Sequence, residues 1–208
     1  MLADQVKIDP ERCALLLMDF QAAIVSIYTK NDSALVERAA SLLTGARNAG
    51  LTVIHVQVAF RPNLPEVSAR NKLLSSIKNS AQHRQIFEGE AGAIHAALAP
   101  QGEDIVVTKR RVNAFAGTDL DMILRARDID TLILAGIATS GVVLSTLLDA
   151  ADRDYRLIVA QDCCADLDAE GHVWLTTRFF PRQAKVVESS ELLIMLRAGG
   201  SSQRAAQQ

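Results

Sequence analysis

Short apolar runs alternate along the chain with segments whose apolar residues recur every three or four positions. The short runs predict strands that are buried on both faces, at residues 13–20, 51–60, 104–109, 130–136, 155–162 and 184–189. The segments with the longer period predict helices at residues 33–50, 118–128, 140–154, 168–180 and 191–199. Asn31, Asp32 or Ser33 is the expected N-cap of the first helix and Gly50 its C-cap, and Thr118 is the expected N-cap of the second. The chain therefore reads as strands and helices in regular alternation.

This alternation predicts the fold class. Buried strands separated by helices favour an α/β protein, here a three-layer α-β-α, Rossmann-like fold around a six-stranded, mainly parallel sheet. The 208 residues, 49% of them hydrophobic, suffice for one core. We expect a single domain over residues 1–200 and a flexible polar tail over 201–208.

The segment 61–103 breaks the alternation. It is rich in proline and glycine and is long for a plain connection. Long insertions after a strand often build a binding site, so we expect this segment to contribute to one.

The composition argues against a nucleic-acid partner, a membrane span and a disulfide-bonded structure. The net charge of −2 and the lack of a basic strip argue against a nucleic-acid partner, and no apolar run is long enough to span a bilayer. The densest basic cluster, at residues 109–111, is expected to end a strand with its two arginines in solvent. Three cysteines, two of them adjacent, do not form a disulfide framework. With a polar opening segment, the sequence favours a soluble cytoplasmic protein that acts on a small molecule.

Two charged residues stand at predicted strand ends, where ligands bind in open parallel sheets. Asp19 ends the first apolar run and Lys109 ends the third. Alone, each is more often structural, as a helix cap or a solvated lysine. A carboxylate in an apolar run needs a partner, however, and a lysine at a nearby strand end supplies one. Such a pair can tune a general acid or base.

Three segments carry a family resemblance: "LLLMDFQ" (15–21), "VVTKRRVNAFAGTDL" (106–120) and "LAGIATSGVVLSTLLDA" (134–150). In this order they resemble the motifs of the isochorismatase-like, or cysteine hydrolase, superfamily. The resemblance implies that Asp19 and Lys109 are the catalytic residues. It also implies a substrate site that includes Gln21, Asn113, Phe115 and Gly141.

The third motif departs from the family pattern at the nucleophile. Its spacing from Asp149 and Ala150 assigns the position of the family's catalytic cysteine to Val142. Valine has no thiol, so this register excludes covalent thiol catalysis there. Members that lack the cysteine hydrolyse a vinyl ether, with the aspartate as general acid and water as the nucleophile. Val142 is bulkier than the glycine usual in those members and would intrude on the pocket.

The turn itself is expected to retain two features through the resemblance. Backbone N–H groups of Ala138 and Val142 would stabilise an anion at the helix N-terminus. The peptide bond between Ile137 and Ala138 would be cis.

No displaced nucleophile is expected to replace the cysteine. Ser140 precedes Val142 by two residues and is expected to act as a helix N-cap, and Ser145 lies one helical turn later. Cys163 and Cys164 follow the fifth strand and could approach the same crevice. Buried cysteines are normally inert.

Metal and cofactor chemistry is not expected. Nicotinamidase-like members place metal ligands after the second strand, where this chain has Val58 and Phe60, and His55 is expected to be a core residue. No glycine-rich phosphate loop follows the first strand, which disfavours a nucleotide-binding module. The resemblance implies a homodimer or homotetramer, and the default position of Trp174, Phe179 and Phe180 is the core.

Two functions remain after these considerations. The first is a hydrolase of a small carboxylate- or carbonyl-bearing molecule that uses Asp19 and Lys109 without a cysteine. The second is a catalytically degenerate member that binds a small ligand or acts through its oligomer surface, because Val142 replaces the nucleophile. The presence of both charged residues favours the first.

Overall fold

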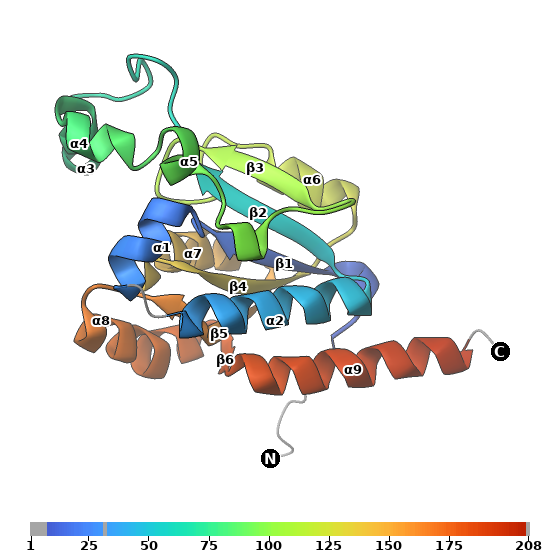
Figure 1. Cartoon of the computed structure of the whole chain (residues 1–208). Helices are drawn as coiled ribbons and strands as arrows, with labels where there is room; N and C mark the ends of the chain where they lie inside the picture. Colours follow the sequence, from blue (N-terminus) through green and yellow to red (C-terminus); the bar gives the residue numbers. More distant parts are fainter. Residues whose placement is uncertain (1–7, 31–32, 207–208) are drawn as a thin grey trace.

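The computed structural model describes residues 8–30 and 33–206 of the chain. Six parallel strands form one sheet in the order β3-β2-β1-β4-β5-β6, which confirms the predicted fold class (Figure 1). Each predicted strand is present: β1 (Cys13–Met18), β2 (Thr52–Val58), β3 (Ile105–Lys109), β4 (Thr131–Ile137), β5 (Arg156–Ala165) and β6 (Lys185–Val187). Among the described residues, no helix is long and apolar enough to cross a membrane.

Helices cover both faces of the sheet. Side chains of α1, α2 and α9 pack on one face and those of α6 and α7 on the other. The α-helices are α1 (Ala22–Thr29), α2 (Ala34–Ala49), α3 (Lys72–Asn79), α4 (Ala81–Gln85), α5 (Gly89–Gly92), α6 (Leu120–Ala126), α7 (Leu144–Asp152), α8 (Ala169–Trp174) and α9 (Ser189–Ala206). Shorter helical segments are η1 (Pro10–Arg12), η2 (Ala96–Leu98), η3 (Thr139–Val143), η4 (Leu175–Phe179) and η5 (Phe180–Arg182).

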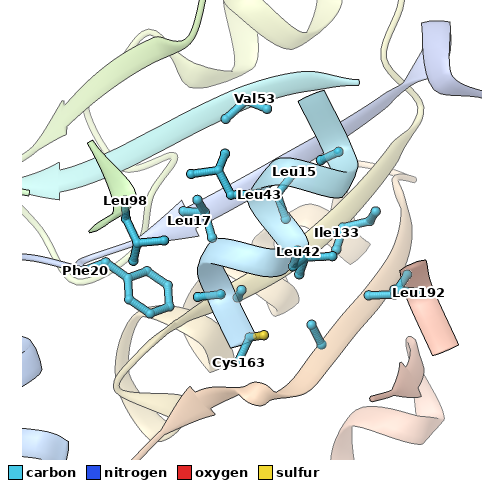
Figure 2. Close-up of a cluster of buried hydrophobic side chains, with 14 of the residues drawn as sticks. Leu15, Leu17, Phe20, Leu42, Leu43, Val53, Leu98, Ile133, Cys163 and Leu192 are labelled. Atoms are coloured by element: carbon cyan, nitrogen blue, oxygen red, sulfur yellow. The ribbon is translucent and has the colours of Figure 1, made fainter. Parts of the chain in front are cut away.

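The sheet divides the core into two apolar layers. Alternate residues of β1 point to opposite faces, as the strand period requires: Leu15 and Leu17 pack under α2, and Leu16 and Met18 pack under α6 and α7. Figure 2 shows the first layer, where Leu42 and Leu43 of α2 lie over the sheet. All six residues of β1 are buried, which explains why its sequence is a continuous apolar run.

The structure adds elements that the apolar pattern does not indicate. Helix α1 follows β1, and α3, α4 and α5 occupy the irregular segment 61–103. These helices have only four to eight residues, and those of the insertion bury few side chains, so none provides the long periodic pattern from which a helix is predicted. The last helix, α9, continues to Ala206, which corrects its predicted end at residue 199. The division between the domain and a flexible tail at residue 201 stays a prediction. Alanine, glutamine and arginine after the two glycines favour this continuation, and residues 207–208 lie outside the described part.

The structure also tests the predicted helix caps and the predicted burial of His55. Gly50 ends α2 in a left-handed conformation, with φ of 79°, as expected of a C-cap. Ser33 precedes α2; the alternative caps at 31 and 32 lie outside the described residues. Thr118 lies one residue before the N-cap Asp119 rather than at it. His55 is buried, with Nε2 3.2 Å from Oδ2 of Asp104, which confirms it as a satisfied core residue.

Gly136 allows β4 to approach β1 at the end of the sheet that carries Asp19. A Cβ atom on Gly136 would lie 2.8 Å from the carbonyl oxygen of Met18 and 2.9 Å from its Cβ. Both contacts are too short, and the backbone oxygen cannot rotate away. Only glycine therefore fits at this position without moving the end of β1.

We predict that Gly136→Ala lowers the free energy of unfolding by about 1–3 kcal/mol, the usual cost of overpacking a buried position. The measurement is urea unfolding followed by circular dichroism. Gly141→Ala is the matched control, because a Cβ atom there would lie 3.7 Å from the nearest heavy atom, an ordinary contact. Equal stability of the two variants would contradict the steric argument.

Candidate active site

A buried ion pair joins the ends of β1 and β3. Lys109 Nζ lies 2.8 Å from Asp19 Oδ2, and the two residues are 2% and 6% exposed. Strand β2 lies between β1 and β3, so the lysine side chain reaches past the end of β2 to its partner. Lys109 Nζ also donates to the carbonyl oxygen of Arg111 at 3.1 Å. The two residues predicted to be catalytic are therefore in direct contact.

The backbone holds Asp19 in an uncommon conformation. Its φ of 59° is in the left-handed region, which costs a residue with a side chain about 1–2 kcal/mol. Its N–H donates to the carbonyl oxygen of Val56 at 2.8 Å, which ties it to β2. Strained residues of this kind often occur at functional sites.

One oxygen of the Asp19 carboxyl group is unused. Among the described residues, Oδ1 has no hydrogen-bond partner although it is buried. Desolvation raises the pKa of Asp19 above its usual range, and the charge and hydrogen bond of Lys109 offset part of that rise. A carboxyl group with a raised pKa and a free oxygen is suited to proton transfer.

The turn after β4 is held by two side chains from the segment that follows β5. Thr139 Oγ1 lies 2.8 Å from Nδ1 of His172, and the backbone N–H of Ser140 donates to Asp166 Oδ2 at 2.7 Å. The peptide bond between Ile137 and Ala138 is cis, as expected from the resemblance. Sequence reasoning missed His172 and Asp166, because no local spacing links them to a turn so far away in the chain.

Val142 is buried behind this turn. It is 2% exposed and belongs to the core layer under α6 and α7. Ser145 Oγ donates to the carbonyl oxygen of Gly141 at 2.8 Å, so its hydroxyl is engaged in its own helix. Ser140 is not the N-cap, because the helical turn begins after Ala138. Gly141 lies in the turn and is partly exposed.

The cysteines are buried in the two core layers. Cys13 and Cys163 pack in the layer under α2, and Cys164 packs in the opposite layer. Burial raises the pKa of Cys13 and of Cys164 to about 12 and raises that of Cys163 as well. A thiol with a raised pKa forms little thiolate, so these residues are poor nucleophiles.

The side-chain amide of Gln21 is fully hydrogen-bonded within the protein, to the end of β2 and to α5. Its side chain accepts from the N–H of Val58 at 2.8 Å and donates to the carbonyl oxygens of Val58 and Gly92 at 3.0 and 2.6 Å. Gln21 is 1% exposed. These contacts explain why a glutamine stands two residues after Asp19, since an amide can both accept and donate hydrogen bonds. The role of Gln21 in substrate binding stays a prediction.

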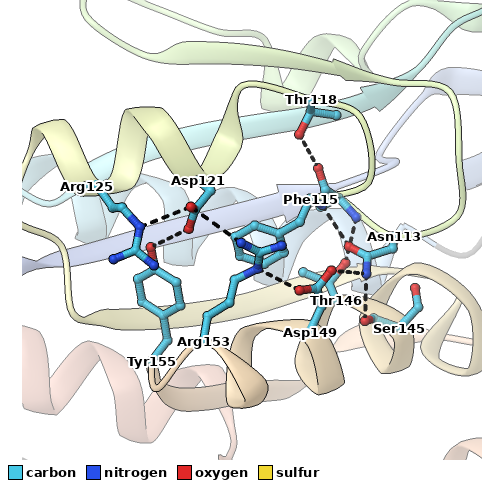
Figure 3. Close-up of polar contacts among 11 residues, drawn as sticks. Asn113, Phe115, Thr118, Asp121, Arg125, Ser145, Thr146, Asp149, Arg153 and Tyr155 are labelled. Carbon is cyan, nitrogen blue, oxygen red and sulfur yellow. Dashed lines mark hydrogen bonds and ion pairs between the residues drawn. The ribbon is translucent and has the colours of Figure 1, made fainter.

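Asn113 and Phe115 take part in a polar network on the α7 side of the sheet (Figure 3). The amide of Asn113 donates to Asp149 Oδ2 at 2.7 Å, and Phe115 stacks on Tyr155 beneath the guanidinium of Arg153. These contacts occupy both side chains within the protein. They give no support to the expected role of Asn113 and Phe115 in substrate binding.

Two expectations about exposure, for the arginines at 110–111 and for Trp174, were wrong. Arg110 Nε lies 3.2 Å from Glu66 Oε1, and Arg111 donates to the carbonyl oxygen of Glu66 at 3.1 Å, so these arginines bind the inserted segment rather than extend into solvent. Trp174 is 56% exposed, whereas Phe180 is fully buried.

Among the described residues, no cluster of three metal-ligating side chains occurs.

We predict that Lys109→Met raises the pKa of Asp19 further, because it removes the contributions that lower it. Breaking a buried pair at one end costs about 3–5 kcal/mol. An acid whose pKa is higher in the folded than in the unfolded chain stabilises the fold below its unfolded pKa, about 4, and loses that contribution as pH rises through the folded pKa. The stability deficit of the variant should therefore grow with pH over this window.

Urea unfolding at a series of pH values measures this effect. Arg110→Met is the control, because it removes a cation from the adjacent position, which pairs with Glu66 instead. A deficit for Lys109→Met that does not change with pH would contradict the proposed coupling.

Comparison with known proteins places the chain in a family. The isochorismatase domain family matches residues 13–191. Maleamate amidohydrolase of Pseudomonas putida is 31% identical over 164 residues, which cover 76% of this chain and 75% of the relative. The uncharacterized isochorismatase family protein YecD of Escherichia coli O157:H7 is 31% identical over 190 residues, 90% of this chain and 98% of the relative.

A solved structure agrees with this assignment. The cysteine hydrolase from Pseudomonas syringae pv. phaseolicola superposes with a TM-score of 0.82 at 26% identity and covers 93% of this chain and 96% of its own. The Asp19–Lys109 pair lies at the strand ends of a sheet with the order given above. With the family match over residues 13–191, this chain belongs to the isochorismatase family of hydrolases.

Proposed function

We propose that this protein hydrolyses a small carboxylate- or carbonyl-bearing molecule through Asp19 and Lys109, without a cysteine nucleophile. The observation that carries the proposal is the buried ion pair with one carboxyl oxygen, Oδ1, that has no partner among the described residues. A purely structural pair would be expected to engage both oxygens, because an unsatisfied buried acceptor is costly.

The chemistry assigned to each residue follows from its surroundings. Asp19 acts as the general acid or base, since desolvation raises its pKa toward the range where proton transfer is efficient. Lys109 holds the carboxyl group in place and limits that rise. Water is the nucleophile, because Val142 stands where the family's cysteine is expected and the three cysteines are buried.

The surroundings of the pair supply binding groups in this proposal. Backbone N–H groups of Ala138 and Val142 stabilise negative charge that develops on the substrate. Gln21 and Gly141 border the site, and Gln21 is held by two hydrogen bonds to Val58 at the end of β2 and one to Gly92 of α5. The relative named maleamate amidohydrolase acts, by its name, on an amide, which supports a carbonyl-bearing substrate. No metal or cofactor takes part in the proposed reaction.

We predict that Asp19→Asn lowers kcat by at least about 10²–10³-fold, the usual contribution of a general acid or base. The wild-type protein is first screened against small carboxylate-bearing amides and vinyl ethers, beginning with maleamate. Circular dichroism checks that the variant is folded. Unchanged turnover in folded Asp19→Asn would contradict the proposal.

Val142→Cys distinguishes an active from a disarmed scaffold. If wild type is inactive on every compound and Val142→Cys gains amidase activity, the protein is a degenerate member whose site lost only its nucleophile. If wild type is active, the substitution tests whether water or a thiol serves better in the same site.

We further propose a cytoplasmic homodimer or homotetramer. Three large apolar side chains around α8 are exposed: Leu167 at 59%, Val173 at 55% and Trp174 at 56%. Clustered exposed apolar residues of this kind often mark contacts between subunits. A second copy of this chain covers that surface in the proposed oligomer.

Trp174→Glu is predicted to shift the protein to a smaller oligomer, because it would place charge in an apolar contact. Light scattering coupled to size-exclusion chromatography measures the mass. Ile194→Glu, at an exposed apolar residue of α9 that is 68% exposed, is the control. A mass that stays the same in Trp174→Glu, or falls equally in both variants, would exclude α8 as the contact.

A further inference from the structure

A pocket unrelated to the family motifs lies in the arm, which we define as residues 60–92. Helices α3 and α4 of the arm stand beyond the end of the sheet (Figure 1). The pocket has a volume of about 630 Å³, which suits a small molecule. Its lining includes Phe60, Arg61, Leu64, Lys78, Arg84 and Phe87.

One side of the pocket is apolar. The rings of Phe60 and Phe87 meet edge to face, with centroids 5.4 Å apart and planes at 88°. Leu64 is 5% exposed and packs with Phe60 in a small core of the arm. Edge-to-face pairs hold aromatic side chains in fixed positions and offer a ligand ring a defined surface.

The other side carries positive charge that is held in place. Lys78 Nζ donates to the carbonyl oxygen of Leu64 at 2.9 Å, and Arg84 Nη1 donates to the carbonyl oxygen of Lys78 at 2.5 Å. Neutral carbonyl groups orient these cations without cancelling their charge. Within the described ranges, neither Lys78 nor Arg84 forms an ion pair with a carboxylate. Lys78 and Arg84 are therefore oriented and electrostatically available to an anion.

The remaining charges of the pocket leave it net positive. Arg61 lies 3.8 Å from Glu66, a weak pairing, and Glu88 is the acid of the lining. Three cations against one lining acid favour a ligand with negative charge. Because Glu88 is exposed, its charge is screened by solvent more than those of the half-buried Lys78 and Arg84.

The pocket is connected to the strand end that carries Lys109. The N–H of Ala59 donates to the carbonyl oxygen of Lys109 at 3.2 Å, and Phe60 is the next residue. Asn63 and Leu64 both have positive φ, 65° and 46°, which bends the chain back so that the carbonyl group of Leu64 meets Lys78. The fold thus builds the pocket wall directly onto the edge of the sheet near the ion pair.

From these observations we propose that the arm pocket binds a small organic carboxylate with an aromatic or planar apolar body. The carboxylate contacts Lys78 and Arg84, and the apolar body lies against Phe60 and Phe87. The binding does not depend on turnover at Asp19. The carboxylate belongs either to the substrate or to a separate effector, and inhibition kinetics distinguish the two.

Calorimetric titration of the full chain with benzoate tests the proposal, with benzamide as the neutral analogue and inorganic phosphate as an anion without a ring. We expect benzoate to bind at least tenfold more tightly than either. Arg84→Gln and Lys78→Gln should each weaken benzoate binding about tenfold or more. Arg70→Gln, at an exposed arm arginine outside the pocket, should not change it.

Several results would overturn the proposal. These are no benzoate binding at millimolar concentration, equal binding of benzoate and benzamide, equal binding of phosphate, or benzoate binding that Arg84→Gln and Lys78→Gln leave intact. Circular dichroism identifies any variant that fails to fold. Because each residue is substituted separately, a folded variant remains for the comparison if one does not fold.

Two further measurements distinguish binding in the arm pocket from the proposed hydrolysis. Asp19→Asn should bind benzoate as wild type does, so a loss of turnover leaves the pocket testable. With any compound that wild type hydrolyses, competitive inhibition by benzoate and a raised KM in Arg84→Gln identify the substrate's own carboxylate as the ligand. Inhibition or activation that changes kcat alone identifies an effector.

Discussion

The buried pair of Asp19 and Lys109 imposes the strictest demand on this fold. Two charges can be removed from water only if each is held close to the other, and here the distance is 2.8 Å. Because the residues come from β1 and β3, the contact requires β2 to lie between them in the correct register. Val58 pairs with Lys109, and Met18 pairs with Val56, so the three strand ends are fixed together. A shift of one residue in either pairing would turn one charge to the other face of the sheet.

The turn after β4 lies next to the end of β1, on the side opposite β2. Gly136 brings β4 close to Met18, and the segment after β5 contributes Asp166 and His172 to hold Ser140 and Thr139. The turn is thus built from two separate parts of the chain. Val142 packs inward into the core layer under α6 and α7, and its side chain takes no part in these hydrogen bonds.

Much of the fold was readable in the sequence because buried parallel strands leave continuous apolar runs. The residues of β1 and β4 are all buried, and both strands were located correctly. The ion pair was also predictable, since Asp19 interrupts an apolar run and Lys109 ends another. The helices of the arm were not, because they are short and bury few side chains.

The contacts of Asn113, Phe115 and Arg111 lay beyond sequence reasoning for a related reason. Each side chain satisfies a partner far away in the chain, and a spacing pattern records only neighbours. Asn113 binds Asp149, and Arg111 binds the backbone of Glu66 in the arm. Conversely, Trp174 has the sequence character of a core residue but is exposed, since helical spacing gives no information about whether a neighbouring element covers that face.

The arm leaves the sheet after β2 and returns before β3, the edge strand, and it has a small core of its own around Leu64, Val67 and Leu74. Substitutions inside that core can be accommodated locally, because the large apolar layers of the domain do not include these three residues. The Asp19–Lys109 pair, by contrast, is tied to three strands at once. The arm can therefore vary in shape and charge while the strand register that holds this pair is kept, so the two parts of the molecule tolerate change independently.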